Sequence, residues 1–289
     1  MKSLLKFNGI AIGYVRGPGS QAQILCSKKN FAERFLITPK IAYLINLDRR
    51  QDRWDEFAVK ASKFDIPVER FSAVEGLELP KNELRLPPPV TACWMSHQKV
   101  AREFLNGEAT HCLVLEDDVD LNQKAIFGLE ELWKRNLQHV DLLQIGFCVH
   151  HNRLSNRVKH STQVLLVTIL NRLRLLNLEL VRRIFRLLYG YDFRRIKQLS
   201  QPVAAMTFEL GTHAYVMSRE FARTIISFNY PVYLPADLAM MELAKTGKFE
   251  AFRLIKPLIN QNDSPSSISN ASLNALEAEI AQANRSWES

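Results

Sequence analysis

Three consecutive carboxylates, Glu116, Asp117 and Asp118, follow directly on the apolar run at residues 112–115. Because like charges held this close repel one another, the arrangement is costly unless something cationic compensates it. Carboxylate oxygens suit hard divalent ions such as Mg2+ or Mn2+, which bind through one or two side chains and complete their shell with water and substrate phosphate. The run therefore predicts a metal position, with a solvated acidic turn that caps the next helix as the alternative.

A second group of charges lies at residues 45–54, where another apolar run ends. Three of its side chains are guanidinium groups, Arg49, Arg50 and Arg53. Guanidinium groups and the free amides at a helix start both favour phosphate, so these residues predict an anion site. The alternative is a set of surface ion pairs with the neighbouring carboxylates, Asp48, Asp52 and Asp55.

Seven short motifs between residues 41 and 268 stand in the order, and at roughly the spacing, found in one known family. They occupy residues 46–53, 70–76, 93–97, 113–118, 211–215, 235–237 and 257–261. In these motifs the chain resembles glycosyltransferase family 25, the lipooligosaccharide galactosyltransferase family. Two departures are visible: Ala92 stands where the family commonly has glycine, and the segment 150–205 is longer and more cationic than the family leads us to expect.

The resemblance implies a GT-A-like fold and the transfer of a sugar, usually galactose, from a UDP-sugar to a growing glycan with inversion at the anomeric carbon. It implies that Asp118 contacts a Mn2+ or Mg2+ cofactor, while Glu116 and Asp117 position the donor or its loop. It also implies a set of donor-binding residues: Asn46, Leu47, Arg49, Arg50, Arg53, His97, Glu116, Asp117, His213 and Gln261. For His97, His213 and Gln261 a packing role is the equal alternative.

Inverting transfer also needs a base that takes the proton of the acceptor hydroxyl, and a Lewis acid that stabilises the departing diphosphate. A metal on Asp118 with support from arginine supplies the second. The base must lie across the sugar from the diphosphate, so it should come from another part of the chain. We expect Asp237, with Glu209 and Glu242 as the next candidates, although Asp237 is equally suited to cap a helix that begins at Leu238.

The elements that must hold these side chains read as alternating strands and helices. Strands are expected at residues 41–47, 68–73, 112–115, 140–147, 213–217 and 249–255. Helices are expected from Asp52, at 96–105, at 219–228 after an N-cap at Ser218, and in the tail from Asn270. This alternation predicts an α/β fold with a mostly parallel sheet flanked by helices, in which ligands bind at the carboxyl ends of strands. Glu116 ends such a strand and therefore lies on the ligand side.

The chain has 289 residues, of which 47% are apolar and 24% charged, as is typical of a globular protein. Its apolar stretches are too short to span a membrane, and residues 1–15 make a poor signal peptide, so we expect a cytoplasmic location. The sequence divides into an unassigned extension at 1–40, a GT-A-like domain at 41–268 and a helical tail at 269–289. Its four cysteines stand far apart without histidines at zinc-finger spacing, which predicts free thiols.

Almost all of the net charge of +8 comes from a basic insertion at residues 150–205. Its leucines and arginines fall on two faces of one expected amphipathic helix, with Phe185, Tyr189 and Tyr191 suited to the depth of lipid headgroups. We expect this insertion to contact an anionic membrane surface or a glycolipid acceptor, which would make the protein peripheral on the inner membrane. A core-packed helix with a solvated face is the alternative.

The rival interpretation makes the basic insertion the functional part of a membrane- or nucleic-acid-binding protein whose nucleotide-sugar-binding domain is non-catalytic. The insertion lacks a recognised nucleic-acid motif and is too rich in leucine for a simple phosphate-binding arm. No nucleic-acid partner is therefore expected.

Overall fold

The computed structural model describes residues 4–7, 10–13, 41–63, 67–80, 84–133, 137, 139–148, 154–195, 203–205 and 207–262. The chain divides into two compact units, Met1–Leu36 and Ile37–Ser289. The first contains a hairpin of two antiparallel strands, β1 (Leu4–Phe7) and β2 (Ile10–Gly13). The helix expected in the tail from Asn270 lies outside the described residues.

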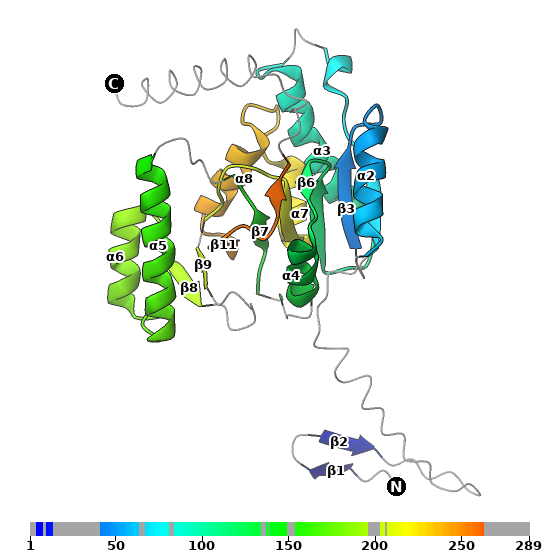
Figure 1. Ribbon diagram of the computed structural model, residues 1–289. Helices are drawn as coiled ribbons and strands as arrows, with labels where there is room; N and C mark the ends of the chain where they lie inside the picture. The colour runs from blue at the N-terminus through cyan, green and yellow to red at the C-terminus, as the bar shows by residue number, and fades with distance from the viewer. Residues whose placement is uncertain are drawn as a thin grey trace, which may run out of the picture. The chain divides into compact units, whose positions relative to one another are not determined.

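An eight-stranded sheet, with strand order β4-β3-β5-β10-β7-β11-β9-β8, forms the centre of the second unit (Figure 1). Its strands are β3 (Ile41–Asn46), β4 (Val68–Ser72), β5 (His111–Glu116), β7 (Leu142–Gly146), β8 (Phe193–Arg195), β9 (Val203–Ala205), β10 (Ala214–Ser218) and β11 (Ala251–Leu254). All of these strands point the same way except β9 and β10, which run antiparallel to their neighbours. The expected α/β architecture, a GT-A-like and mostly parallel sheet flanked by helices, is confirmed.

Both faces of the sheet are covered because its central strands are apolar on both sides. In β3, Ala42 and Leu44 point into one core and Tyr43 and Ile45 into the other, as the alternation of side chains along a strand requires. The first core also contains side chains of α2 (Gln51–Ala61) and α4 (Gln123–Trp133). The second contains those of α3 (Pro88–Asn106), α7 (Arg219–Ser227) and α8 (Ala236–Lys245).

The first residues of α3 and α7 can be compared with the helix starts that the sequence predicts. The expected helix at 96–105 is longer than predicted, since α3 already begins at Pro88. A proline in the first helical turn loses no hydrogen bond there, because the N–H groups of that turn have no partner within the helix. The sequence favours a proline-rich loop at residues 80–89, but its last two residues, Pro88 and Pro89, belong to the helix. At α7 the predicted N-cap is confirmed, because the hydroxyl of Ser218 accepts a hydrogen bond of 3.1 Å from the backbone N of Phe221.

The basic insertion forms two helices, α5 (Leu154–Arg172) and α6 (Glu179–Tyr189), so the expectation of one amphipathic helix is wrong. A turn separates them, and within it Arg174 has a φ of 59°. The two helices share a small core with β8, in which Phe185 is only 2% exposed. Phe185 thus packs inside the protein and is not placed at headgroup depth. None of the described helices is long and apolar enough to cross a bilayer.

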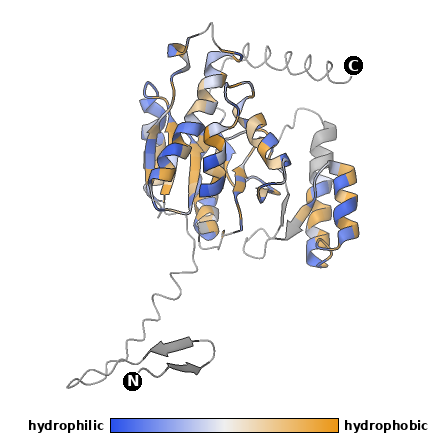
Figure 2. Ribbon diagram, turned by 180° about the vertical axis from the view of Figure 1, so that it is seen from behind, coloured by the Kyte–Doolittle hydropathy of each residue, from blue (hydrophilic) through white to orange (hydrophobic). Residues whose placement is uncertain are grey.

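Both helices of the insertion carry apolar side chains on faces that none of the other described elements covers. Figure 2 shows hydrophobic and hydrophilic residues side by side on this pair. The exposed large apolar side chains are Leu165, Leu166, Ile169, Leu173, Leu178, Leu180, Ile184, Leu187 and Leu188. These residues are called the leucine face below. Such an accumulation marks an interaction surface more often than a plain solvated one.

Candidate functional site

The carboxyl ends of three neighbouring strands meet at one edge of the sheet. The parallel register places Ile45 beside Glu116 and Asn46 beside Ser72. The loop before β10 arrives at the same edge, because the backbone N of Glu116 donates to the carbonyl of His213 over 2.9 Å. A small ribbon completes the site, in which β12 (Asn260–Gln261) pairs with β6 (Val119–Asp120).

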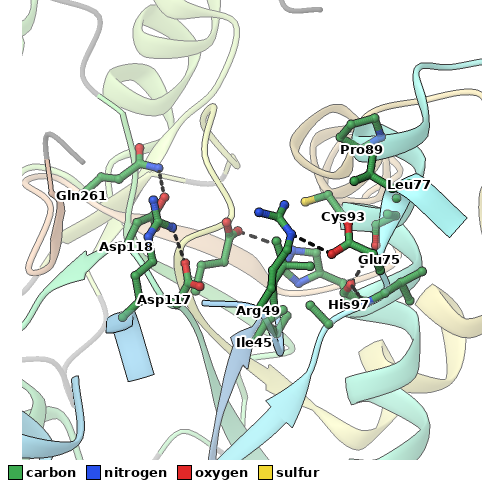
Figure 3. A pocket seen from close by; sticks show the side chains of 18 residues that line it. Ile45, Arg49, Glu75, Leu77, Pro89, Cys93, His97, Asp117, Asp118 and Gln261 are labelled. Carbon is green, nitrogen blue, oxygen red and sulfur yellow. Dashed lines mark hydrogen bonds and ion pairs between the residues drawn. The ribbon is translucent and has the colours of Figure 1, made fainter. Parts of the chain in front are cut away.

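A cavity of about 460 Å³ opens at this edge (Figure 3). Figure 3 shows Asp117, Asp118 and Gln261 at one end and Leu77 and Pro89 at the other. The predicted site residues that line it are Leu47, Arg49, Arg53, His97, Glu116, Asp117, Asp118 and Gln261. The predicted residues Asn46, Arg50, Glu209, His213 and Asp237 are not among the described side chains that line it.

Asp117 is held by two partners from the end of β3 and the start of α2. Its Oδ1 accepts from Arg53 Nη1 over 2.5 Å, and its Oδ2 accepts from Asn46 Nδ2 over 2.7 Å. Arg53 is 7% exposed and Asn46 only 1%. Asn46 also accepts from Arg70 Nε over 2.8 Å, so it joins three segments of the edge. Asp117 therefore fixes the acidic loop against the first strand.

Asp118 has one buried oxygen for which the described residues provide no hydrogen-bond partner. Gln261 Nε2 donates to its Oδ2 over 2.6 Å, while its Oδ1 is buried and has no hydrogen-bond partner among the described residues. Burial and the neighbouring charge of Glu116 raise the pKa of Asp118 to about 7, and Asp117 adds to the effect. A carboxylate with an unmet oxygen in an acidic surrounding fits a hard divalent cation, which would reverse this penalty.

Glu116 lies at the floor of the cavity within a network of buried polar side chains. Its Oε1 accepts from Thr212 Oγ1 over 2.5 Å and lies 3.5 Å from His97 Nε2. Nδ1 of His97 is in turn 3.0 Å from the hydroxyl of Tyr215. Burial acts to raise the pKa of Glu116, but His97 and Thr212 outweigh it, and the pKa lies below its usual range. Glu116 is therefore ionised and oriented.

The remaining predicted donor-binding residues differ in their surroundings. Arg49 lines the cavity, and its Nε donates to Glu75 Oε2 over 2.8 Å. Arg50 instead forms a two-point pair with Asp52. His213 is 1% exposed, and burial lowers its pKa. A Cβ on Gly146 would lie 2.6 Å from the His213 ring, so the glycine allows this histidine to pack against β7.

The candidate bases stand outside the cavity. Asp237 lies in the first turn of α8, where its Oδ1 accepts from the backbone N of Leu238 over 2.9 Å. Burial raises the pKa of Asp237, and the charge of Glu116 contributes to that shift. The Oε2 of Glu209 lies 3.4 Å from Nε of the buried Arg253, and the same guanidinium group donates to the hydroxyl of Tyr191 in the basic insertion. Glu242 pairs with Lys245 at the exposed end of α8.

Several residues that line the cavity lie within or beside the family-like motifs but are not among the predicted site residues. Cys93 and Ser96 lie on the second and third turns of α3, and Glu75, Gly76 and Leu77 follow β4. A Cβ on Gly76 would come within 2.8 Å of Pro89, so the cavity wall requires glycine there. The signal for Cys93 was its position four residues before His97, which places both side chains on one helical face.

Replacement of Arg53 by methionine is expected to destabilise the protein by about 3 kcal/mol, because it leaves Asp117 partly buried without its cationic partner. Urea unfolding monitored by circular dichroism measures this change. Adding Asp117→Asn to Arg53→Met should recover part of the loss, since the amide no longer needs a counter-charge. Strictly additive effects of the two changes would show that the pair is not coupled.

Most of the chain is similar in sequence to one known protein family. No curated protein matches the chain by sequence. The family model described as "Glycosyltransferase family 25 (LPS biosynthesis protein)" matches residues 40–240, which includes every strand end that forms the cavity except the Gln261 ribbon. Since that match covers more than half of the 289 residues, the chain belongs to glycosyltransferase family 25, a family of lipopolysaccharide biosynthesis glycosyltransferases.

Proposed function

We propose that this glycosyltransferase uses a divalent metal, Mn2+ or Mg2+, to transfer a sugar from a UDP-sugar to a lipooligosaccharide or related glycan acceptor with inversion. Galactose is the sugar that we expect. The observation that supports this best is the buried Oδ1 of Asp118, which has no hydrogen-bond partner in the described part of the chain and lies at one end of a cavity that Arg49 and Arg53 also line. A carboxylate oxygen available to a cation, with guanidinium groups lining the same cavity, is suited to a diphosphate that is bound to a metal ion.

Asp118 would hold the metal through Oδ1, while its Oδ2 stays bonded to Gln261. When bound, the metal would act as a Lewis acid that stabilises the charge on the departing diphosphate. Asp117 is already committed to Arg53 and Asn46, so it would position the loop without contacting the ion. Glu116, held by Thr212, would orient the donor from the cavity floor.

The nucleoside end of the donor would occupy the opposite end of the cavity. Leu77 and Pro89 supply apolar surface there, and Arg49 stands between them and the acidic end in Figure 3. Ligand cavities of this kind combine mostly apolar walls with a few polar groups that fix orientation. Asp237, outside the cavity, would act as the base on the acceptor hydroxyl.

The test is a panel of UDP-sugars measured by thermal shift and by donor hydrolysis, each with Mn2+ and with a chelator. We expect one UDP-sugar to stabilise the protein only when metal is present, because binding to the folded state raises the melting temperature. Asp118→Ala should remove the response. A protein that responds to no nucleotide sugar would contradict the proposal and favour the non-catalytic binding protein instead.

We also propose that the leucine face contacts an anionic membrane, which would place the enzyme beside a lipid-anchored acceptor. Arg172, Arg174 and Arg183 are exposed on the same two helices and the turn between them, so the surface combines apolar and cationic groups. Helices with this combination lie in the headgroup region of anionic bilayers. Arg182 and Arg186 are paired with Glu179 and Asp192, and Arg183 lies 3.7 Å from Glu179, so these three contribute less than Arg172 and Arg174.

Leu187→Glu, at a side chain that is 85% exposed, is expected to weaken binding to phosphatidylglycerol vesicles about tenfold, because it removes one buried leucine and adds repulsion. Vesicle sedimentation measures this. Val59→Glu is the matched control, since Val59 is an exposed apolar residue on α2. Binding of the wild type should weaken with salt. Equal binding to neutral phosphatidylcholine vesicles would count against the proposal.

A further inference from the structure

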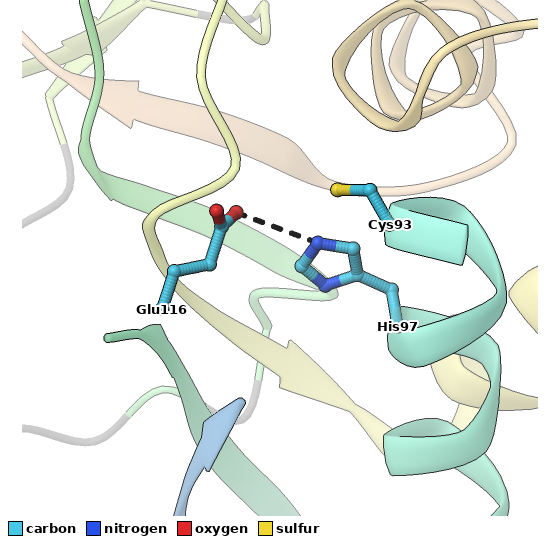
Figure 4. Close-up of side chains that lie close together, drawn as sticks. All are labelled: Cys93, His97 and Glu116. Carbon is cyan, nitrogen blue, oxygen red and sulfur yellow. Dashed lines mark ion pairs between the residues drawn. The ribbon is translucent and has the colours of Figure 1, made fainter. Parts of the chain in front are cut away.

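Cys93, His97 and Glu116 bring three different ligand atoms together at the floor of the cavity. Cys93 and His97 are one helical turn apart on α3, and Glu116 comes from the end of β5 (Figure 4). The thiol sulfur, an imidazole nitrogen and a carboxylate oxygen all lie within 4.8 Å of one another. The sequence alone predicts that Cys93 is a free thiol, because Glu116 is distant from Cys93 and His97 along the chain.

The ring of His97 is held in one orientation by Tyr215. His97 is 1% exposed, and its Nδ1 lies 3.0 Å from the hydroxyl of Tyr215. Its Nε2 is buried without a hydrogen-bond partner among the described residues, and Glu116 Oε1 lies 3.5 Å away. Histidines that bind metals commonly use their other ring nitrogen in a hydrogen bond that fixes the ring. His97 therefore has a fixed ring and a buried Nε2 that faces Glu116 at a distance longer than an ordinary hydrogen bond.

We propose that Cys93, His97 and Glu116 form a binding site for Zn2+, separate from the hard-metal position at Asp118. A set of sulfur, nitrogen and oxygen ligands selects Zn2+ over Mg2+ or Mn2+, whereas the oxygens of Asp118 suit the latter. All three side chains line the cavity, so a fourth position stays open to water. Bound Zn2+ occupies the cavity floor and engages Glu116, and it therefore competes with the donor.

The experiment titrates metal-free protein with Co2+, which replaces Zn2+ and gives a thiolate-to-metal absorption band. We expect a band in the wild type that Zn2+ abolishes and that Mn2+ leaves unchanged. Cys93→Ser should lose the band, whereas Cys148→Ser should keep it, because Cys148 is a second half-buried thiol that contacts Gln261. His97→Gln should weaken Co2+ binding about a hundredfold. Loss of a residue that only orients a metal ligand already costs about 10- to 100-fold in affinity, and loss of a ligand should cost at least as much.

Absence of the band in the wild type, or its persistence in Cys93→Ser, would overturn the site. Circular dichroism establishes that each variant is folded, and His97→Gln provides an independent result should Cys93→Ser fail to fold. These measurements need no nucleotide, so their outcome does not depend on the proposed transfer reaction.

Competition between Zn2+ and the donor does rest on the proposed function. If Zn2+ and the donor compete, Zn2+ should remove the stabilisation by the UDP-sugar in the wild type but not in Cys93→Ser.

Discussion

Asp118→Asn is expected to abolish sugar transfer and, at the same time, to stabilise the metal-free protein. Loss of transfer follows if Asp118 holds the metal that stabilises the departing diphosphate, and we expect a fall in kcat of about a thousandfold. The gain in stability has a separate cause. Burial and the charges of Glu116 and Asp117 raise the pKa of Asp118 to about 7, so its ionised form is unfavourable in the folded protein.

The sign of the pH dependence follows from this raised pKa. In the folded protein Asp118 keeps its proton up to about pH 7, whereas the ordinary value is 3.8. Between these two values the folded state binds more protons than the unfolded state, so the stability of the metal-free protein falls as pH rises. Asparagine has no proton to lose, and its side-chain oxygen can still accept from Gln261. At pH 8 the variant should gain on the order of 2 kcal/mol, or about 5 °C in Tm.

Thermal melts of both proteins at pH 5 and pH 8, with and without Mn2+, measure these effects. The two melting temperatures should lie closer together at pH 5, and Mn2+ should raise the wild type alone. Asp120→Asn is the matched control, since Asp120 is an acidic residue two positions away whose Oδ2 accepts from Asn122. A variant that keeps full transfer activity would exclude Asp118 as the metal ligand.

Six of the eight strands of the sheet could be predicted from the sequence because most of them are short apolar runs with polar or turn-forming neighbours, whereas the short strands β8 and β9 within the basic insertion were not predicted. The runs at β3, β5 and β7 are buried on both faces, and such strands carry a strong local signal. Strand direction carries no such signal. The antiparallel course of β10 depends on pairing with β5 and β7, which are distant along the chain. The sequence does not predict the turn between α5 and α6, because the leucines of the turn continue the helical spacing of apolar residues.

For the site, the sequence indicated which side chains gather at the sheet edge but not what each contacts. Asp117 and Asp118 are adjacent and chemically alike, yet one is neutralised by Arg53 and the other keeps a free oxygen. That difference depends on packing of α2 against the acidic loop. In the same way, Cys93 is a plain thiol in the sequence, and only the register of β5 brings Glu116 to it.

Asp237→Asn should lower transfer by about a hundredfold to ten-thousandfold, the usual contribution of a general base, while donor binding is preserved. Asp237 does not line the cavity, so the metal-dependent thermal shift with the UDP-sugar should be unchanged. The variant should also fold, because an asparagine oxygen can accept the same hydrogen bond from the backbone N of Leu238. A structural defect would instead lower stability and donor binding together.

The pH profile separates a base from a residue that merely begins a helix. Burial raises the pKa of Asp237, so the wild-type rate should fall on the acidic side as this carboxylate gains its proton. The residual rate of Asp237→Asn should lack that acidic limb. Glu209→Gln is the control, because Glu209 is a carboxylate outside the cavity that pairs with Arg253. If Asp237→Asn turned over normally and Glu209→Gln did not, the base would be Glu209, and the acceptor would approach from the side of the basic insertion.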